Sequence, residues 1–278
     1  MAKFEIVIDK TVVLPDKAAR PSVVLPFSFT VGRKVYDEKN CSPSTIKDAL
    51  ENGTKVRSQI IPKDSTLALE KLLDEGKDVL VLCLSSGLSD SFATTNYIVK
   101  GLRIKHPDRK IIAVDTLSCC GGESLLYSLA CDLQKSGLTI DETAEKLDEA
   151  KMRLHHVLYV EDTSLLLQSG SPSAPSIVNV KSIFDLTRNG QIGIHAKTMG
   201  RKKAITDIIK YAASTIDKDN QNVVITYTDE QEAKLIASKL SALLPSATIE
   251  YKAENPFVSA YLLDNSVCVC FFGEPRKA

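Results

Sequence analysis

The sequence predicts an α/β fold in two domains, an N-terminal domain with a Rossmann-like parallel sheet and a C-terminal α/β domain with a mixed or antiparallel sheet. In the first half, short and almost continuously apolar runs alternate with amphipathic stretches, which is typical of parallel strands covered by helices. In the second half, the turn Arg188-Asn189-Gly190 joins two strand-like runs, a strong hairpin signal. The length of 278 residues suits one large or two medium domains.

In the first half, strands and helices follow one another in order. Apolar runs predict strands at residues 4–8, 78–84 and 110–115. Amphipathic or turn-bounded stretches predict helices at residues 63–75, 88–103, 121–135 and 140–153. This alternation favours right-handed crossovers. Residues 23–36 form a further extended stretch, and because Pro26 interrupts it, we expect it at an edge of the sheet or across it.

The second half follows a loop rich in Ser, Pro and Gly at residues 169–176. The elements predicted after this loop are strands at 177–186 and 191–196, a helix at 200–215, a strand at 222–227, a helix at 229–243, a strand at 247–252, a short helix at 255–261 and a strand at 265–272. No linker is marked by composition, so the halves are expected to pack together. We place the domain boundary within residues 145–160 and divide the chain into residues 1–153 and 154–278.

Composition excludes several classes of protein. The 35 basic residues balance 35 acidic ones, so no broad basic face is expected for nucleic acid. No apolar run approaches the roughly 20 residues that cross a bilayer, and the N-terminus lacks the apolar region of a signal peptide. We therefore expect a cytoplasmic protein that is not an integral membrane protein. Its seven cysteines, odd in number and mostly within apolar runs, indicate buried, reduced thiols.

A turn rich in hydroxyl groups, Ser85-Ser86-Gly87-Leu88-Ser89-Asp90-Ser91, follows the predicted strand 78–84. At the carboxyl end of a parallel strand, it offers N–H and O–H donors to a carboxylate or a phosphate. Capping of the following helix explains the same serines equally well. A nucleophilic serine is disfavoured because Cys83 and Leu84 stand where a hydrolase turn needs glycine.

Two other segments carry residues suited to a ligand. Arg57, with Ser58 and Gln59, precedes the helix 63–75, and its guanidinium can bind a carboxylate with two hydrogen bonds, although most surface arginines are only solvated. The segment from Asp115 to Gly122 joins a strand to a helix, and its small residues allow close approach to a ligand or to the other domain.

No metal or nucleotide site is predicted. Cys119 and Cys120 are not a CxxC pair, and Cys268 and Cys270 alternate on a strand, so both face the same side. The adjacent residues His155 and His156 point in different directions. Neither GxxxxGK[ST] nor GxGxxG occurs in the sequence.

Taken in order, these segments resemble the DegV family, the fatty-acid-binding subunits that present an acyl chain to bacterial fatty acid kinase. The resemblance extends over nearly the whole chain. The residues that carry it are Val7-Ile-Asp9, Leu14-Pro15, Val24 to Gly32, Tyr36-Asp37, Ser58-Gln59, Ser85 to Ser89, Val114 to Ser118, Gly121-Gly122, Gly170, Asn179-Val-Lys181, Asn189-Gly190 and Lys202-Lys203-Ala204.

The resemblance implies a two-domain α/β protein that buries one lipid tail in an apolar tunnel, formed partly by the C-terminal domain, while polar groups hold the carboxylate. It implies a binding subunit and no catalytic residues, with ATP chemistry in a separate kinase subunit and no cofactor besides the bound fatty acid. The ligand-binding residues it implies are Ser85, Ser86, Gly87, Ser58, Arg57 and Tyr261. Of the two serines in the turn, Ser86 is preferred.

This sequence departs from the DegV pattern at several positions, which indicates a divergent member of the family. Arg57 stands at the position of the family's head-group Thr, and Tyr261 begins the segment that aligns with a His-containing one. Gly170-Ser171-Pro172 replaces a Gly-Gly-Arg turn, and Asp90-Ser91 replaces Gly-Thr. Arg57 can either form an ion pair with the carboxylate or fill the head-group space and prevent binding.

Two other functions stay open. The first is an enzyme that acts on a small phosphorylated or carboxylated metabolite through Arg57 and the serine turn, with Asp9 or Asp115 as the base at a strand end. The second is a relative that has lost its ligand and serves as an interaction module.

Overall fold

The N-terminal half of the chain forms a parallel sheet in the computed structural model, which describes residues 4–14, 16, 18–37, 39–163, 166, 180–262 and 265–276. The strand order is β2-β1-β6-β7, and all pairs are parallel. Its strands are β1 Glu5–Asp9, β2 Val23–Leu25, β6 Val79–Cys83 and β7 Ile111–Asp115. The predicted parallel sheet is therefore confirmed.

A second, six-stranded sheet is formed by the later part of the chain. Its order is β10-β9-β8-β13-β11-β12, in which only β11 and β12 pair in parallel, so the predicted mixed sheet is confirmed. Its strands are β8 Leu154–Tyr159, β9 Val180–Leu186, β10 Ile192–Met199, β11 Asn222–Tyr227, β12 Thr248–Ala253 and β13 Val267–Phe272. The Asn189-Gly190 turn joins β9 to β10, as predicted.

Part of the predicted C-terminal region lies outside the described residues. This applies to the loop 169–176 with its Gly170-Ser171-Pro172 turn and to the first residues of the predicted strand 177–186. The division of the chain between residues 153 and 154 stays a prediction. It falls between the 3₁₀ helix η1 Lys151–Arg153 and the start of β8.

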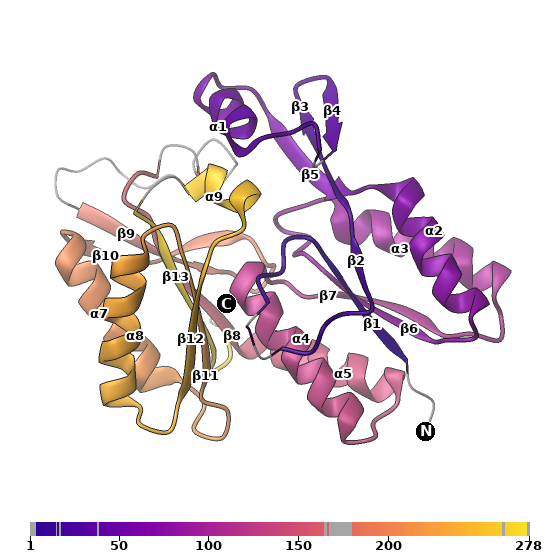
Figure 1. Ribbon diagram of the computed structural model, residues 1–278. Coiled ribbons are helices and arrows are strands. Elements are labelled where there is room, and N and C mark those ends of the chain that lie inside the picture. Colours follow the sequence, from indigo (N-terminus) through magenta and orange to yellow (C-terminus); the bar gives the residue numbers. More distant parts are fainter. Residues whose placement is uncertain are drawn as a thin grey trace.

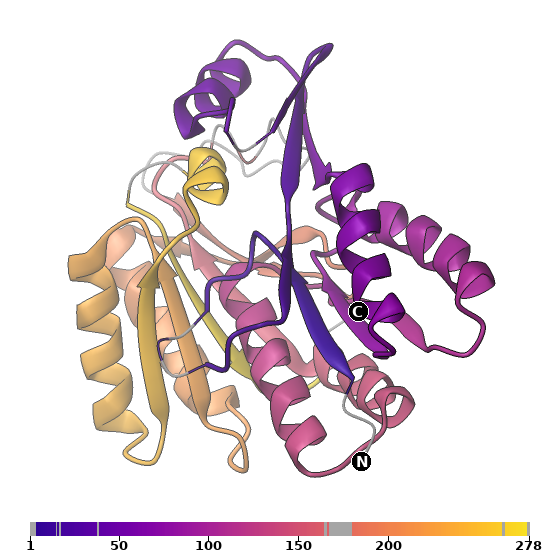
Figure 2. The same ribbon diagram turned by 45° about the vertical axis from the view of Figure 1, so that its right-hand side comes forward.

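Helices cover both sheets, and one helix lies between them (Figures 1 and 2). The long helices are α2 Pro62–Asp74, α3 Ser91–Lys105, α4 Cys120–Lys135, α5 Ile140–Ala150, α7 Arg201–Thr215 and α8 Glu230–Leu243. Helices α2 and α3 pack on one face of the parallel sheet, and α7 and α8 pack on the outer face of the mixed sheet. Between the sheets, α4 contributes Leu125 and Leu126 to a core that includes Ile8 of β1 and Cys270 of β13.

A small sheet not predicted from the sequence lies at one end of the molecule (Figure 1). It consists of β3 Phe27–Val31, β4 Lys34–Asp37 and β5 Val56–Ile60, with β3 in the middle. Pro26 separates β3 from β2, an edge strand of the parallel sheet. The neighbouring helices are α1 Pro43–Glu51 and α9 Pro256–Leu262, which contact each other, and the ring of Phe257 stacks on Phe29 at 4.8 Å. This contact joins the C-terminal part of the chain to the small sheet.

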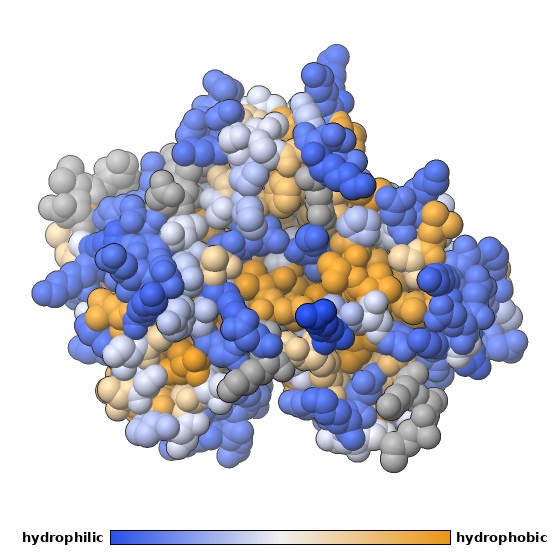
Figure 3. Space-filling view, in the orientation of Figure 1, coloured by the Kyte–Doolittle hydropathy of each residue, from blue (hydrophilic) through white to orange (hydrophobic). Residues whose placement is uncertain are grey.

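The surface between the two halves is partly apolar. On the face shown in Figure 3, hydrophobic residues gather in the middle of the molecule, with hydrophilic residues around them. Among the described residues, no helix combines the length and the apolar character that crossing a bilayer requires.

The start of α4 fits against β8 only because it carries glycine. A Cβ atom at Gly122 would lie 1.9 Å from Nε2 of His156 and 2.5 Å from Oγ of Ser118. These distances are far below van der Waals contact, so a side chain there would push the helix away from the mixed sheet. The small residues predicted to allow close approach therefore do so at this position.

We expect Gly122→Ala to destabilise the protein by about 1–3 kcal/mol, because the added methyl overfills a packed contact. Gly101→Ala is the matched control: Gly101 is an exposed residue of α3, and a Cβ atom there would have no other atom within 4 Å, so alanine should stabilise the helix by roughly 0.5–1 kcal/mol. Urea unfolding of both variants measures the difference. Equal stabilities for the two variants would show that the close approach is not required.

Candidate functional site

A cavity of about 870 Å³ lies where the two large sheets, the small sheet and α9 meet. Its volume falls in the range typical of small-molecule sites. Much of its wall is apolar. The apolar lining residues are Phe27, Phe29, Val56, Leu84, Leu88, Leu158, Leu166, Phe184, Leu186, Ile192, Phe257, Val258 and Leu262. Such a wall suits an apolar chain.

A polar rim, defined here as Arg57, Ser58, Ser86, Ser89 and Asp90, belongs to the same cavity. Arg57 and Ser58 lie on β5, and the three others lie between β6 and α3. The Oγ of Ser89 donates a hydrogen bond of 2.6 Å to the carbonyl oxygen of Ser58, which joins the two segments. Nη1 of Arg57 lies 4.0 Å from Oδ2 of Asp90, and both side chains are more than half exposed. The rim therefore combines a solvent-exposed cation with hydroxyl groups.

The two serines at the start of the turn have different surroundings. Ser85 is 0% exposed, and its Oγ donates to the carbonyl oxygen of Gly190 at 2.8 Å and accepts from the backbone N–H of Gly87. Ser86 is exposed and lines the cavity, and its hydroxyl makes no hydrogen bond to the described part of the chain. Of this pair, only Ser86 has its hydroxyl available at the cavity.

The Asn189-Gly190 turn packs directly on the serine turn. A Cβ atom at Gly87 would lie 2.6 Å from the backbone of both Asn189 and Gly190, and one at Gly190 would lie 2.0 Å from Oγ of Ser85. The hairpin was predicted, but its contact with a loop so far away in the sequence was not. Sequence periodicity reports neighbours along an element and carries no information about such a contact.

Five of the six residues implied by the resemblance line one cavity: Arg57, Ser58, Ser86, Gly87 and Tyr261. Ser85, the sixth, does not line it. Tyr261 comes from α9, far away in sequence, and burial raises the pKa of its phenol to about 12. At neutral pH it is therefore an uncharged wall residue.

The two aspartates considered as bases are bonded to the backbone. Asp9 is 1% exposed, and its carboxylate accepts from the N–H groups of Thr11 and Leu84, both at 2.9 Å. Burial raises its pKa, and these bonds partly oppose that rise. Oδ1 of Asp115 accepts from the N–H groups of Ser86 and Leu117, both at 3.1 Å. Both carboxylates thus hold the loops that shape the cavity.

Glu123 is buried in the first turn of α4, behind Thr11 of the cavity wall. Its Oε2 accepts from the N–H of Cys120 at 3.1 Å and lies 3.0 Å from Oγ1 of Thr11. Burial, reinforced by the charge of Asp9, raises the pKa of Glu123 well above its usual value. The group is therefore held as a neutral acid over a wider pH range than in the unfolded chain.

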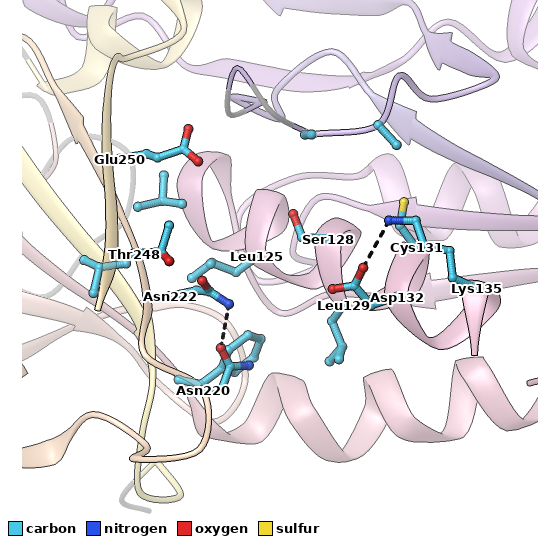
Figure 4. Close-up of a pocket in the computed structure, with 15 residues that line it drawn as sticks. Leu125, Ser128, Leu129, Cys131, Asp132, Lys135, Asn220, Asn222, Thr248 and Glu250 are labelled. Carbon is cyan, nitrogen blue, oxygen red and sulfur yellow. Dashed lines mark hydrogen bonds and ion pairs between the residues drawn. The ribbon is translucent and has the colours of Figure 1, made fainter. Parts of the chain in front are cut away.

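A second, smaller pocket of about 250 Å³ lies between α4 and strands β11 and β12 (Figure 4). Its polar groups include Asn220 and Asn222, which hydrogen-bond each other, and Asp132, which pairs with Lys135. None of the residues predicted to bind a ligand lines this pocket.

The fold and the larger cavity define a class of protein: an α/β protein with two large sheets that encloses a largely apolar cavity with a polar rim. The chain belongs to the DegV family. Residues 3–274 match the family described as "Uncharacterised protein, DegV family", which confirms the resemblance drawn from the sequence.

Similar proteins are known from several bacteria. The chain is 27% identical over 290 residues to the DegV domain-containing protein YteA of Lactococcus lactis, with 99% of each chain covered. Its fold is similar to that of a stearic acid-binding protein from Eubacterium ventriosum, with a TM-score of 0.81, 15% identity and 98% of each chain covered. It is also similar to the Fatty Acid Kinase (Fak) B3 protein of Streptococcus pneumoniae loaded with linoleic acid, with a TM-score of 0.79, 18% identity, and 98% of this chain and 100% of that one covered.

We expect Glu123→Gln to stabilise the protein increasingly as the pH rises. Because the pKa of Glu123 is raised on folding, its favourable contribution is fully present below the unfolded pKa of roughly 4.3 and is lost as the pH rises toward the folded pKa. Glutamine does not titrate, so the stability difference should grow above pH 4.3 by up to about 1.4 kcal/mol per pH unit. Urea unfolding at several pH values from 4 to 8 measures it, and a difference independent of pH would contradict the assignment.

Proposed function

We propose that this protein binds a long-chain fatty acid, with the acyl chain buried in the 870 Å³ cavity and the carboxylate at the polar rim. The observation that carries the proposal is one cavity whose wall is largely apolar and whose rim has an exposed arginine and a serine hydroxyl without a hydrogen bond to the described residues. The similar structures of the stearic acid-binding protein and of the protein loaded with linoleic acid support the same class of ligand.

Burial of the chain supplies most of the affinity in this proposal. Each methylene group removed from water contributes about 0.8 kcal/mol. The burial of an acyl chain of a dozen or more methylenes therefore offsets the loss of translational freedom on binding, even where the head group adds little to the binding free energy. The rim would then set the orientation of the acid, with the carboxylate toward solvent.

Ser86 and Arg57 are the proposed head-group ligands. The hydroxyl of Ser86 would donate to one carboxylate oxygen, and the guanidinium of Arg57 would provide the opposite charge that a neutral hydroxyl cannot. Ser58 of the rim and Gly87 of the cavity wall lie beside the head group in this proposal, and Tyr261 packs against the first part of the acyl chain. Ser85 acts as a positioning residue, because its hydroxyl ties the serine turn to Gly190.

We further propose that the protein is a binding subunit that works with a separate kinase subunit in the cytoplasm. A carboxylate held at an exposed rim can be reached by a second protein, whereas the buried chain cannot. In this arrangement residues 1–153 supply the rim, residues 154–278 complete the cavity, and the phosphoryl-transfer chemistry belongs to the partner. The similarity to the Fak B3 protein supports this division of labour.

We expect native mass spectrometry of the purified protein to show one fatty acid per chain, released on denaturation. Ser86→Ala should weaken binding of added stearic acid about tenfold, the loss typical of a hydrogen bond to a charged group. Ser214→Ala, on the outer helix α7, should leave the affinity unchanged. Protein that carries no lipid and takes up none on addition would refute the proposed function.

Arg57 and Asp90 should affect affinity in opposite directions. Arg57→Gln removes the charge that attracts the carboxylate, so we expect about threefold weaker binding and a smaller dependence on salt. Asp90→Asn frees Arg57 from its ion pair and should strengthen binding. Titration calorimetry at two salt concentrations measures both variants. Tighter binding by Arg57→Gln would indicate that the arginine fills the head-group space.

A further inference from the structure

The inner wall of the cavity is polar, which the binding of a plain hydrocarbon chain does not explain. It is defined here as His156 on β8, Thr226 on β11, Glu254 after β12, and Cys268 and Cys270 on β13, all of which line the cavity. The strand register brings them together, since Cys270 pairs with His156 and Cys268 with Thr226. They face the start of α4, where a Cβ atom at Gly121 would lie 3.0 Å from Thr226 and 3.3 Å from Cys270.

One ring nitrogen of His156 has no partner among the described residues. The side chain is 3% exposed, and Nε2 is 2.7 Å from Oγ of Ser118, whereas Nδ1 makes no hydrogen bond. If Nε2 accepts from Ser118, then Nδ1 is a donor without an acceptor. If Nε2 donates instead, Nδ1 is an acceptor without a donor. In either tautomer a buried polar atom is left unsatisfied, which is costly unless a ligand or water completes it.

Thr226 adds a second unsatisfied atom. It is 1% exposed, and its Oγ1 makes no hydrogen bond of normal geometry among the described residues, although the carboxyl of Glu254 lies nearby. Oε1 of Glu254 accepts from the N–H of Asn255 at 2.8 Å. The inner wall thus carries a ring nitrogen and a hydroxyl that have no hydrogen-bond partner among the described residues, both buried just behind its surface.

The groups around these atoms favour a neutral partner. Burial, with the nearby Arg276 guanidinium, lowers the pKa of His156 to about 3, so its ring is uncharged at neutral pH. Burial raises the pKa of Glu254, which favours its neutral acid. Asp185, which also lines the cavity, is paired with His155. The guanidinium of Arg276 bonds to the carbonyl oxygens of Leu117, Leu154 and Thr187, and Arg276 does not line the cavity. The residues of the inner wall themselves therefore carry no cation for a second carboxylate or a phosphate.

We propose that the inner wall is a second polar subsite, which accepts a neutral oxygen carried along the acyl chain. The ligand class is a long-chain fatty acid with a hydroxyl or carbonyl group away from its carboxylate. This inference rests on the proposed function and specifies its ligand. A hydroxyl suits the site because it both donates and accepts, so it can satisfy His156 in either tautomer.

The test compares stearic acid with hydroxystearic acids that carry the hydroxyl at the second, eighth, tenth or twelfth carbon, each titrated into delipidated full-length protein. We expect at least one of the mid-chain hydroxy acids to bind roughly three- to tenfold more tightly than stearic acid, the range for one or two added hydrogen bonds. The acid hydroxylated at the second carbon, beside the carboxylate, should bind like stearic acid.

Two variants assign the preference to the inner wall. His156→Gln keeps an amide near the Nε2 position for Ser118 but removes Nδ1, and Thr226→Val removes the hydroxyl at nearly constant volume. Each should lower the ratio of the affinity for the mid-chain hydroxy acid to the affinity for stearic acid, both measured on the same variant. Thr143→Val is the matched control, because Thr143 is equally buried with an unpartnered hydroxyl but lies on α5 outside the cavity.

The outcomes separate this inference from the proposed function. If every hydroxy acid binds the wild-type protein no more tightly than stearic acid does, water or nothing completes the inner wall, and this inference is overturned while fatty acid binding stands. A preference that survives in both variants also overturns it. If no acid binds at all, the proposed function fails and this inference fails with it.

Discussion

Where α4 begins, its backbone lies against β8, β11 and β13 without a side chain in between. Gly121 and Gly122 provide this contact, since a Cβ atom at either position would meet Thr226, Cys270 or His156 at 3.3 Å or less. The close approach brings the parallel and mixed sheets to opposite sides of one helix. It also places the loops at the carboxyl ends of β1, β6 and β7 beside the mixed sheet, and the cavity lies at that junction.

Buried carboxylates keep these loops in place. Asp9 bonds to the N–H of Leu84, just before the serine turn, and Glu123 bonds to the N–H of Cys120 at the start of α4. Oγ1 of Thr11 donates to Asp9 and lies 3.0 Å from Oε2 of Glu123, so one hydroxyl joins the end of β1 to the helix between the sheets. Burying two acids side by side is unfavourable, and their raised pKa values reflect that cost. These hydrogen bonds hold the loops in place without a ligand, as expected for a preformed cavity.

The rim and the inner wall have opposite electrostatic characters. Arg57 and Asp90 are exposed and charged, so the rim suits an ion that also contacts water. His156 and Thr226 are buried and uncharged, so the inner wall suits a neutral hydrogen-bonding group. The same cavity is also lined by apolar residues such as Phe184 and Leu158. A ligand that satisfies every part of this cavity has an acidic end, an apolar body and a neutral polar group.

The sequence by itself determined the classes of both large sheets and most of their strands and helices, because apolar runs and helical spacing are local signals. It also identified the Asn189-Gly190 hairpin and the family. It did not predict β8, where His155 and His156 interrupt the apolar run. Nor did it predict β5 or the small sheet, since Val56–Ile60 lacks an apolar run and pairs only with the distant β3. Only the tertiary structure supplied the physical reason for preferring Ser86 to Ser85, through the bond between Ser85 and Gly190, and brought His156 and Thr226 to the cavity. These contacts depend on how distant segments pack, and no local pattern of residues encodes that.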